Sequence, residues 1–299
     1  MTLELIAPAK LNLVLEVTGR RADGYHDIAS VMQTIDLADT VRLEVAAGSI
    51  DLHVAGEAVR GVPREGPRNL AFSAARALAE AARNAGLGAR IELEKRIPAG
   101  MGMGGGSTDA AAVLRGLNRL WGLEMTAQAL TEVAASVGSD VAFFLHGGTA
   151  YVGGRGEVVE PLPDAEPMAL TLFVAEMDIE DKTRRMYGSL SPADFTDGGR
   201  ARVAAESVRR GLPLIESDLC NAFDRHVEGM APQVASAMAL CREERIGVFA
   251  AGSGPGFFTP VALDELPPLL LRELAHDWGV RAVACRSLGR ATATAMRET

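Results

Sequence analysis

The chain has 299 residues, of which 48% are hydrophobic and 23% charged, and its formal net charge is -9. This length allows one or two globular domains, and the composition excludes disordered and fibrous proteins. The acidic balance and the lack of any run of Lys and Arg argue against nucleic acid as a partner. Three cysteines, Cys220, Cys241 and Cys285, lie far apart without a CxxC pair, so we expect neither a disulfide framework nor a zinc site.

The opening segment, MTLELIAPAKLNLVLEV, alternates between apolar and polar residues, which predicts a β-strand. Its apolar positions from Leu5 to Val17 are expected on one face, with Lys10, Asn12 and Glu16 on the other. Charged residues interrupt the apolar run, so this segment is predicted to be neither a signal peptide nor a membrane span. We therefore expect a cytoplasmic protein without a membrane partner.

Later segments predict a mixture of strands and helices. Strands are expected at 30–37, 40–46, 90–94, 149–152, 169–175, 247–251 and 280–285, and helices at 69–84, 107–121, 126–136, 200–209 and 264–277. Several strands follow one another before a helix intervenes, and this order favours an α+β fold over strict βαβ alternation. Gly and Pro concentrate in GGRGEVVEPLPDAEP, which predicts a boundary near residue 155 between domains at 1–155 and 156–299.

A glycine-rich loop precedes the second predicted helix, in the sequence IPAGMGMGGGSTDAAAVL. The start of a helix offers unpaired N–H groups and the positive end of its dipole, and glycines allow positive φ and a close approach to a ligand. Successive N–H groups can then form a nest for phosphate oxygens, to which Ser107 and Thr108 add hydroxyl donors. The competing interpretation is a plain connection that begins a buried helix with a Ser cap.

This loop matches neither of the two familiar phosphate-binding patterns. A P-loop requires Lys where Ser107 stands, and the dinucleotide pattern G-x-G-x-x-G requires a preceding strand and an acidic residue about twenty positions later. If the loop holds phosphates, their positive partner must therefore come from elsewhere in the chain.

The segment PAGMGMGGGSTDAAA resembles the second motif of the GHMP kinases, in which the loop holds the phosphates of ATP. Further similar segments are APAKLNLVLEVTGRRADGYHDIASVMQTIDLAD, EKRIP, VGSDVAFFLHGGTAYVGGRGE and AAGSGPGFF. They resemble the branch of that superfamily that uses ATP to phosphorylate the 2-hydroxyl of a cytidine-diphosphate-linked methylerythritol, in the non-mevalonate isoprenoid route. The resemblance runs from Leu5 to about Gly256 and is loose between 161 and 248.

The resemblance implies a two-domain α+β GHMP kinase fold, with the active site in the cleft between the domains. It also implies ATP and Mg²⁺ as cofactors, a small-molecule substrate, and a monomer or homodimer. Two alternatives stay open: another GHMP kinase of homoserine or mevalonate type, and a non-catalytic regulator that binds a nucleotide or metabolite on the same fold. The GYH sequence and the presence of both Lys10 and Asp140 count against them.

Two residues are assigned to the reaction itself by the resemblance. Lys10 is expected at the reacting hydroxyl, and Asp140 is expected to act as its general base. Asn12 lies two positions after Lys10 on the same predicted strand, so both side chains point the same way, and it is expected to orient the substrate. Taken without the resemblance, Lys10 reads as a solvated edge-strand lysine and Asp140 as a helix N-cap or turn residue.

The resemblance also implies a binding site for the cytosine ring. The turn RADGYHD presents Tyr25 as an aromatic face and His26 as a polar edge, and pyrimidines bind by stacking with hydrogen bonds at their edges. Tyr187 occupies the place of a second stacking ring, although a core or surface tyrosine would look the same. The third motif, AAGSGPGFF, places Gly252 and Gly254 near the phosphates and the substrate, and a hairpin turn is the competing account.

The remaining expectations concern ATP. Its binding residues are expected to be Pro98, Gly100, Gly102, Gly104, Gly105, Gly106, Ser107 and Thr108 in the loop, with Asn69 and Lys95 at the purine and ribose. Helix capping is the competing account of Asn69. Met101 and Met103 depart from the smaller or branched residues common in this loop. The ligands of Mg²⁺ are not evident from the sequence, apart from Ser107 or Thr108, either of which could supply one.

Overall fold

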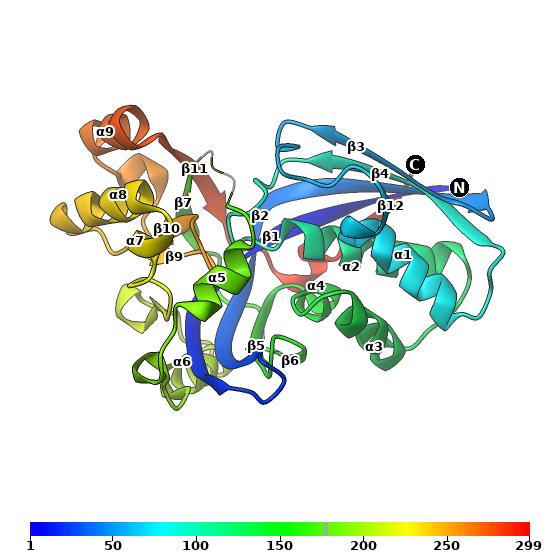
Figure 1. Ribbon diagram of the computed structural model, residues 1–299, viewed down its shortest axis with the longest axis horizontal. Helices are drawn as coiled ribbons and strands as arrows, with labels where there is room; N and C mark the ends of the chain where they lie inside the picture. Colours follow the sequence, from blue (N-terminus) through cyan, green and yellow to red (C-terminus); the bar gives the residue numbers. More distant parts are fainter. Residues whose placement is uncertain (176, 178) are drawn as a thin grey trace.

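The computed structural model describes residues 1–175, 177 and 179–299, and its two sheets with packed helices confirm the predicted α+β class (Figure 1). The first sheet has the order β12-β1-β2-β4-β3, with β5 paired to β2, β6 to β5 and β8 to β1. Its strands are β1 (Thr2–Arg20), β2 (His26–Ala47), β3 (Ile50–Gly56), β4 (Leu87–Lys95), β5 (Thr149–Gly153), β6 (Val158–Pro161), β8 (Cys220–Asn221) and β12 (Met296–Glu298). The long strand β2 covers two segments that were predicted as separate strands.

The second sheet is antiparallel and has the order β11-β7-β10-β9. Its strands are β7 (Ala169–Ala175), β9 (Phe249–Ala250), β10 (Phe257–Thr259) and β11 (Val280–Arg286). The two sheets lie in different halves of the molecule, and both chain ends lie at the far end of the first (Figure 1). Strands β6, β8 and β12 follow residue 155 in the chain yet pair with the first sheet, so the boundary near residue 155 stays a proposal.

Helices pack against both sheets. They are α1 (Leu70–Ala81), α2 (Gly105–Leu120), α3 (Ala127–Val137), α4 (Val141–His146), α5 (Lys182–Gly188), α6 (Gly199–Arg209), α7 (Val227–Met230), α8 (Pro232–Glu243), α9 (Pro268–Trp278) and α10 (Arg290–Ala293). Short 3₁₀ turns are η1 (Gly66–Arg68), η2 (Pro192–Asp194), η3 (Glu216–Asp218) and η4 (Leu263–Glu265). Helices α1 to α4 cover one face of the first sheet, and α7 to α9 gather at the second (Figure 1). No helix among the described residues is long and apolar enough to cross a membrane.

Strand β1 is buried on both faces from Ala7 to Glu16, which corrects the prediction of a single apolar face for this part of the strand. Its pairing with β2 shifts register between Pro8 and Lys10 and again between Asn12 and Val14, as β-bulges do. The core under α1 and α2 contains the buried side chains of β1 up to Ala7 and again from Leu15, whereas those of Ala9, Leu11, Leu13 and Val14 belong to a second core. The bulges re-aim Lys10, so that its Cγ lies 3.3 Å from where a Cβ on Gly104 would stand, at the start of α2.

Candidate active site

The glycine loop adopts the backbone conformation that its sequence predicts. Gly100, Gly102 and Gly104 have φ values of 76°, 83° and 75°, a region that glycine enters without steric cost. Helix α2 begins at Gly105, two residues earlier than expected, and its N-cap residue Gly104 provides no side-chain hydrogen bond. The interpretation with Ser107 as the cap is therefore wrong. The first N–H groups of α2 have no side-chain cap, as an anion-binding helix start requires.

Alternate residues of the loop anchor it to the body of the protein. Met101 and Met103 are buried in the second core cluster, which explains why long apolar side chains stand there. The carbonyl of Met103 accepts a hydrogen bond from the N–H of Lys10 at 3.0 Å. The loop is thus fixed to β1 beside Lys10 while its glycines bend away from the core.

Lys10 and Asp140 come together at this loop. The Nζ atom of Lys10 lies 3.6 Å from Oδ2 of Asp140 and donates a hydrogen bond to Oδ1 of Asn12 at 2.6 Å. Asn12 in turn donates to the hydroxyl of Ser30 at 2.8 Å. Lys10 is 4% exposed, so the description of a solvated edge-strand lysine is wrong. The ammonium group is held in one place by a chain of hydrogen bonds along β1 and β2.

Asp140 stands at the N-cap position of α4, but its side chain makes no capping hydrogen bond. Capping therefore does not account for this carboxylate. Its side chain is 31% exposed, and a Cβ on Gly156 would lie 3.4 Å from its Oδ1. The carboxylate is therefore partly exposed beside the ammonium group of Lys10, and its role as a general base stays a prediction.

The third glycine motif forms a hairpin turn that lies beside the glycine loop and Lys10. Strands β9 and β10 form the hairpin, and its loop packs directly on the glycine loop. A Cβ on Gly102 would lie 1.7 Å from the carbonyl oxygen of Ala251. A Cβ on Gly252 would lie 2.9 Å from Nζ of Lys10. Only residues without a side chain allow the two loops and the lysine to meet this closely.

Asn221 on β8 holds the hairpin loop in position, and sequence reasoning missed it. Its Nδ2 donates to the carbonyl oxygens of Ala250 and Gly252 at 2.7 and 2.8 Å. Gly252 and Gly254 have φ values of 55° and 60°. An isolated Asn carries no chemical signature in a sequence, because its partners lie far along the chain.

Two of the three predicted substrate-side aromatic residues lie together. The rings of His26 and Tyr187 are 5.2 Å apart at an angle of 32°. The ring of Tyr25 is 54% exposed, and the guanidinium of Arg155 lies 4.8 Å from its centroid. Burial, and secondarily the charge of Asp140, raise the pKa of Tyr187, so its phenol stays neutral. A sandwich of cytosine between Tyr25 and Tyr187 stays a prediction.

Asn69 is occupied in capping α1. Its Oδ1 accepts the N–H of Ala71 at 2.9 Å, and its Nδ2 donates to the carbonyl of Pro63 at 2.8 Å. The capping account is therefore confirmed, and a role of Asn69 at the purine stays a prediction.

Lys95 lies beneath the start of α2 between two buried carboxylates. Its Nζ donates to Asp39 and Asp109, and a Cβ on Gly105 would lie 3.6 Å from it. Burial raises the pKa of Asp109 to about 7, against the opposing charge of Lys95 and together with that of Asp39. Contact between Lys95 and ATP stays a prediction, and its two acidic partners were missed because neither forms a pattern with it in the sequence.

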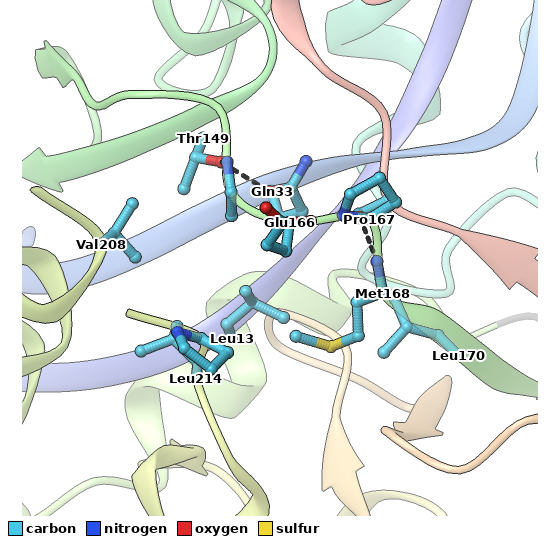
Figure 2. A pocket seen from close by; sticks show the side chains of 12 residues that line it. Leu13, Gln33, Thr149, Glu166, Pro167, Met168, Leu170, Val208 and Leu214 are labelled. Atoms are coloured by element: carbon cyan, nitrogen blue, oxygen red, sulfur yellow. Dashed lines mark hydrogen bonds between the residues drawn. The ribbon is translucent and has the colours of Figure 1, made fainter. Parts of the chain in front are cut away.

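A separate cavity of about 140 Å³ lies where β1, β2 and β5 approach β7 and α6 (Figure 2). Leucine side chains such as Leu13 and Leu170 line it, and the hydroxyl of Thr149 on its wall donates to Gln33 at 2.6 Å. None of the predicted site residues lines this cavity. It is therefore distinct from the site at Lys10 and Asp140.

Comparison with known proteins identifies the class. The model of the GHMP kinases N terminal domain matches residues 69–148. A 4-diphosphocytidyl-2-C-methyl-D-erythritol kinase of Exiguobacterium sibiricum is 42% identical over 264 residues, which cover 86% of this chain and 88% of the relative. A crystal structure of 4-(cytidine 5'-diphospho)-2C-methyl-D-erythritol kinase is 34% identical, with a TM-score of 0.72, and covers 96% of this chain and 99% of its own.

The glycine loop at the start of α2, the two sheets and the domain match together define a phosphotransferase of the GHMP kinase class. A homoserine kinase from Cytophaga hutchinsonii superposes with a TM-score of 0.73 at 16% identity, so the fold alone does not distinguish acceptors. Sequence identity over most of both chains distinguishes the family. The chain belongs to the 4-diphosphocytidyl-2-C-methyl-D-erythritol kinase family, which confirms the predicted resemblance.

Proposed function

We propose that this chain transfers the γ-phosphoryl group of ATP to the 2-hydroxyl of 4-diphosphocytidyl-2-C-methyl-D-erythritol, with Lys10 and Asp140 at the reacting hydroxyl. The observation that carries the assignment is their 3.6 Å separation beside the uncapped start of α2. A proton acceptor, a cation and an anion-binding helix start are the three groups that phosphoryl transfer to an alcohol requires at one place.

In this reaction Asp140 accepts the proton of the hydroxyl as its oxygen attacks the γ-phosphorus. The bond from that phosphorus to the bridging oxygen breaks, and its electron pair leaves with ADP. Lys10 neutralises negative charge near the acceptor oxygen, and Asn12 holds the ammonium by a 2.6 Å hydrogen bond. Because the transition state of phosphoryl transfer is loose, positioning and charge neutralisation matter more than the strength of the base.

The glycine loop, from Pro98 to Thr108, is proposed to bind the phosphates of ATP through its N–H groups. The described residues contain no group of three His, Cys, Asp or Glu that could hold a metal ion. Mg²⁺ is proposed to be held mainly by the phosphates of ATP, as is common for this ion, with the hydroxyl of Ser107 or Thr108 as a candidate protein ligand. When bound there, Mg²⁺ supplies charge neutralisation of the triphosphate.

The acceptor side is proposed to bind cytidine through Tyr25, His26 and Tyr187, with the methylerythritol reaching Gly252 and Gly254. A neutral, partly buried phenol ring such as that of Tyr187 suits stacking against a pyrimidine. All three cysteines are free thiols, which supports the proposed cytoplasmic location. The oligomeric state, monomer or homodimer, stays a prediction.

The test is a panel of acceptors with ATP: the cytidine-diphosphate-linked methylerythritol, mevalonate and homoserine, with product identified by ³¹P NMR. We expect turnover with the first alone. Asp140→Asn should lower kcat by about 10²–10⁴-fold while changing ATP affinity little, because a general base contributes that much. Asp264→Asn, an exposed control on η4, should behave as wild type. Wild-type turnover by Asp140→Asn would reject the base assignment.

A further inference from the structure

Lys182 is a buried lysine beside the active site that sequence reasoning did not single out. It is the first residue of α5 and is 9% exposed. Its Nζ donates a hydrogen bond to the carbonyl oxygen of Gly254, in the loop of the third glycine motif. A lone lysine in the loosely matched part of the chain carries no pattern that would have identified it.

Among the residues that the structure describes, the ammonium group of Lys182 finds little compensation for its burial. No carboxylate among the described residues lies within ion-pair distance of its Nζ, and the carbonyl of Gly254 is its hydrogen-bond acceptor there. Burial, and secondarily the charge of Lys10, lower the pKa of Lys182 to about 7, although the charge of Asp140 partly opposes them. A buried cation of this kind is costly unless an anion arrives to pair with it.

The position of Lys182 indicates which anion would pair with its ammonium group. Gly254, its hydrogen-bond partner, has its N atom 3.1 Å from where a Cβ on Gly102 would stand, so this ammonium sits where the two glycine loops meet. Lys10 approaches the same hairpin loop at Gly252. Two ammonium groups therefore flank residues 252–254 at the loop that is proposed to hold phosphates. Among the described residues, Asp140 is the carboxylate that interacts with both lysines: it lies 3.6 Å from Nζ of Lys10, and its charge raises the pKa of Lys182.

We propose that Lys182 binds the γ-phosphoryl group of ATP and is the second cation, with Lys10, that neutralises it during transfer. This inference rests on the proposed function. It answers a question that the sequence raised, because the glycine loop has Ser107 where a P-loop has its lysine. A cation supplied from α5 takes that role. The negative charge of the bound γ-phosphoryl group raises the pKa of Lys182 and keeps it protonated during transfer. The hydroxyl proton goes to Asp140, and the electron pair of the broken P–O bond goes to ADP.

The experiment compares Lys182→Met, Lys182→Arg and an exposed control on the same helix, Arg184→Met. Titration calorimetry measures binding of ADP and of the non-hydrolysable analogue AMP-PNP, which differ by the γ-phosphoryl group. We expect Lys182→Met to weaken AMP-PNP by about 10- to 100-fold, the value of a charged hydrogen bond, and to leave ADP within about twofold. Its kcat should fall by about 10²–10³-fold.

Lys182→Arg should retain the preference for AMP-PNP and recover most of kcat, and Arg184→Met should match wild type in both. Equal losses for ADP and AMP-PNP would mean that Lys182 only supports the hairpin, and unchanged kcat would also overturn the proposal. If Lys182→Met does not fold, Lys182→Gln replaces it, with the same expected loss for AMP-PNP alone.

Nucleotide binding is measured without acceptor, so the two proposals fail separately. Wild-type chain that prefers AMP-PNP through Lys182 yet does not phosphorylate the cytidine-linked acceptor would reject the proposed function. Wild-type turnover of that acceptor, with Lys182→Met unaffected, would reject the role of Lys182.

Discussion

Replacing Gly102 with Ala tests whether the two glycine-rich loops meet as described. Gly102 has a φ of 83°, and a Cβ there would lie 1.7 Å from the backbone oxygen of Ala251. Backbone cannot rotate away as a flexible side chain can. The loops must separate by roughly 1.3 Å before this distance reaches 3.0 Å, the shortest that real Cβ atoms show.

Gly100 provides a matched control in the same loop. Its φ is 76°, and a Cβ there would have no atom within 4 Å. Both substitutions carry the cost of a left-handed backbone, about 1–2 kcal/mol. Overpacking adds about 1–3 kcal/mol at Gly102 alone. We therefore expect Gly100→Ala to lower the free energy of unfolding by about 1–2 kcal/mol and Gly102→Ala by about 2–5 kcal/mol.

Urea unfolding followed by circular dichroism measures both values, provided that the slopes of the two variants agree. Turnover provides a second readout, since a displacement of about 1 Å at a reacting centre costs on the order of 10²-fold in rate. Gly102→Ala should lose at least that much kcat/KM. Equal unfolding free energies for the two folded variants would refute the contact between the loops.

Two further predictions concern Asp109 and Tyr25. Asp109 has its pKa raised from 3.8 to about 7, so the folded state favours its neutral form, and this contribution to stability is lost as pH rises from about 4 through about 7. Asp109→Asn mimics the neutral form at every pH. Its free energy of unfolding should therefore exceed that of wild type by a few kcal/mol at pH 8, and the two values should approach each other at pH 4. A difference that stays constant with pH in urea unfolding would contradict the assignment. Tyr25→Ala should weaken the cytidine-linked acceptor by about 1–3 kcal/mol and leave ATP unchanged by calorimetry, and equal losses for the two ligands would count against stacking.

Local features of the fold were predictable from the sequence. The helices near α1, α2, α3, α6 and α9 and the longer strands were found within a few residues, because apolar periodicity and glycine φ act over short stretches of chain. The short strands β3, β6, β8, β10 and β12 were not predicted. Strands β8, β10 and β12 have only two or three residues, which carry no periodic signal, and pairing with a distant partner is what makes them strands. Strands β3 and β6 have seven and four residues, and their pairing with β4 and β5 identifies them.

The candidate site also has one part that was predictable from the sequence and one part that was not. The glycine loop could be recognised from its own residues, since its proposed function depends on backbone freedom and on the end of one helix. The pairing of Lys10 with Asp140, and the burial of Lys182 against Gly254, depend on contacts between segments far apart in the chain. Bulges in β1 and the packing of one glycine loop on another decide those contacts. Side chains from distant elements converge only when the tertiary structure brings their backbones together, and no local pattern encodes that distance.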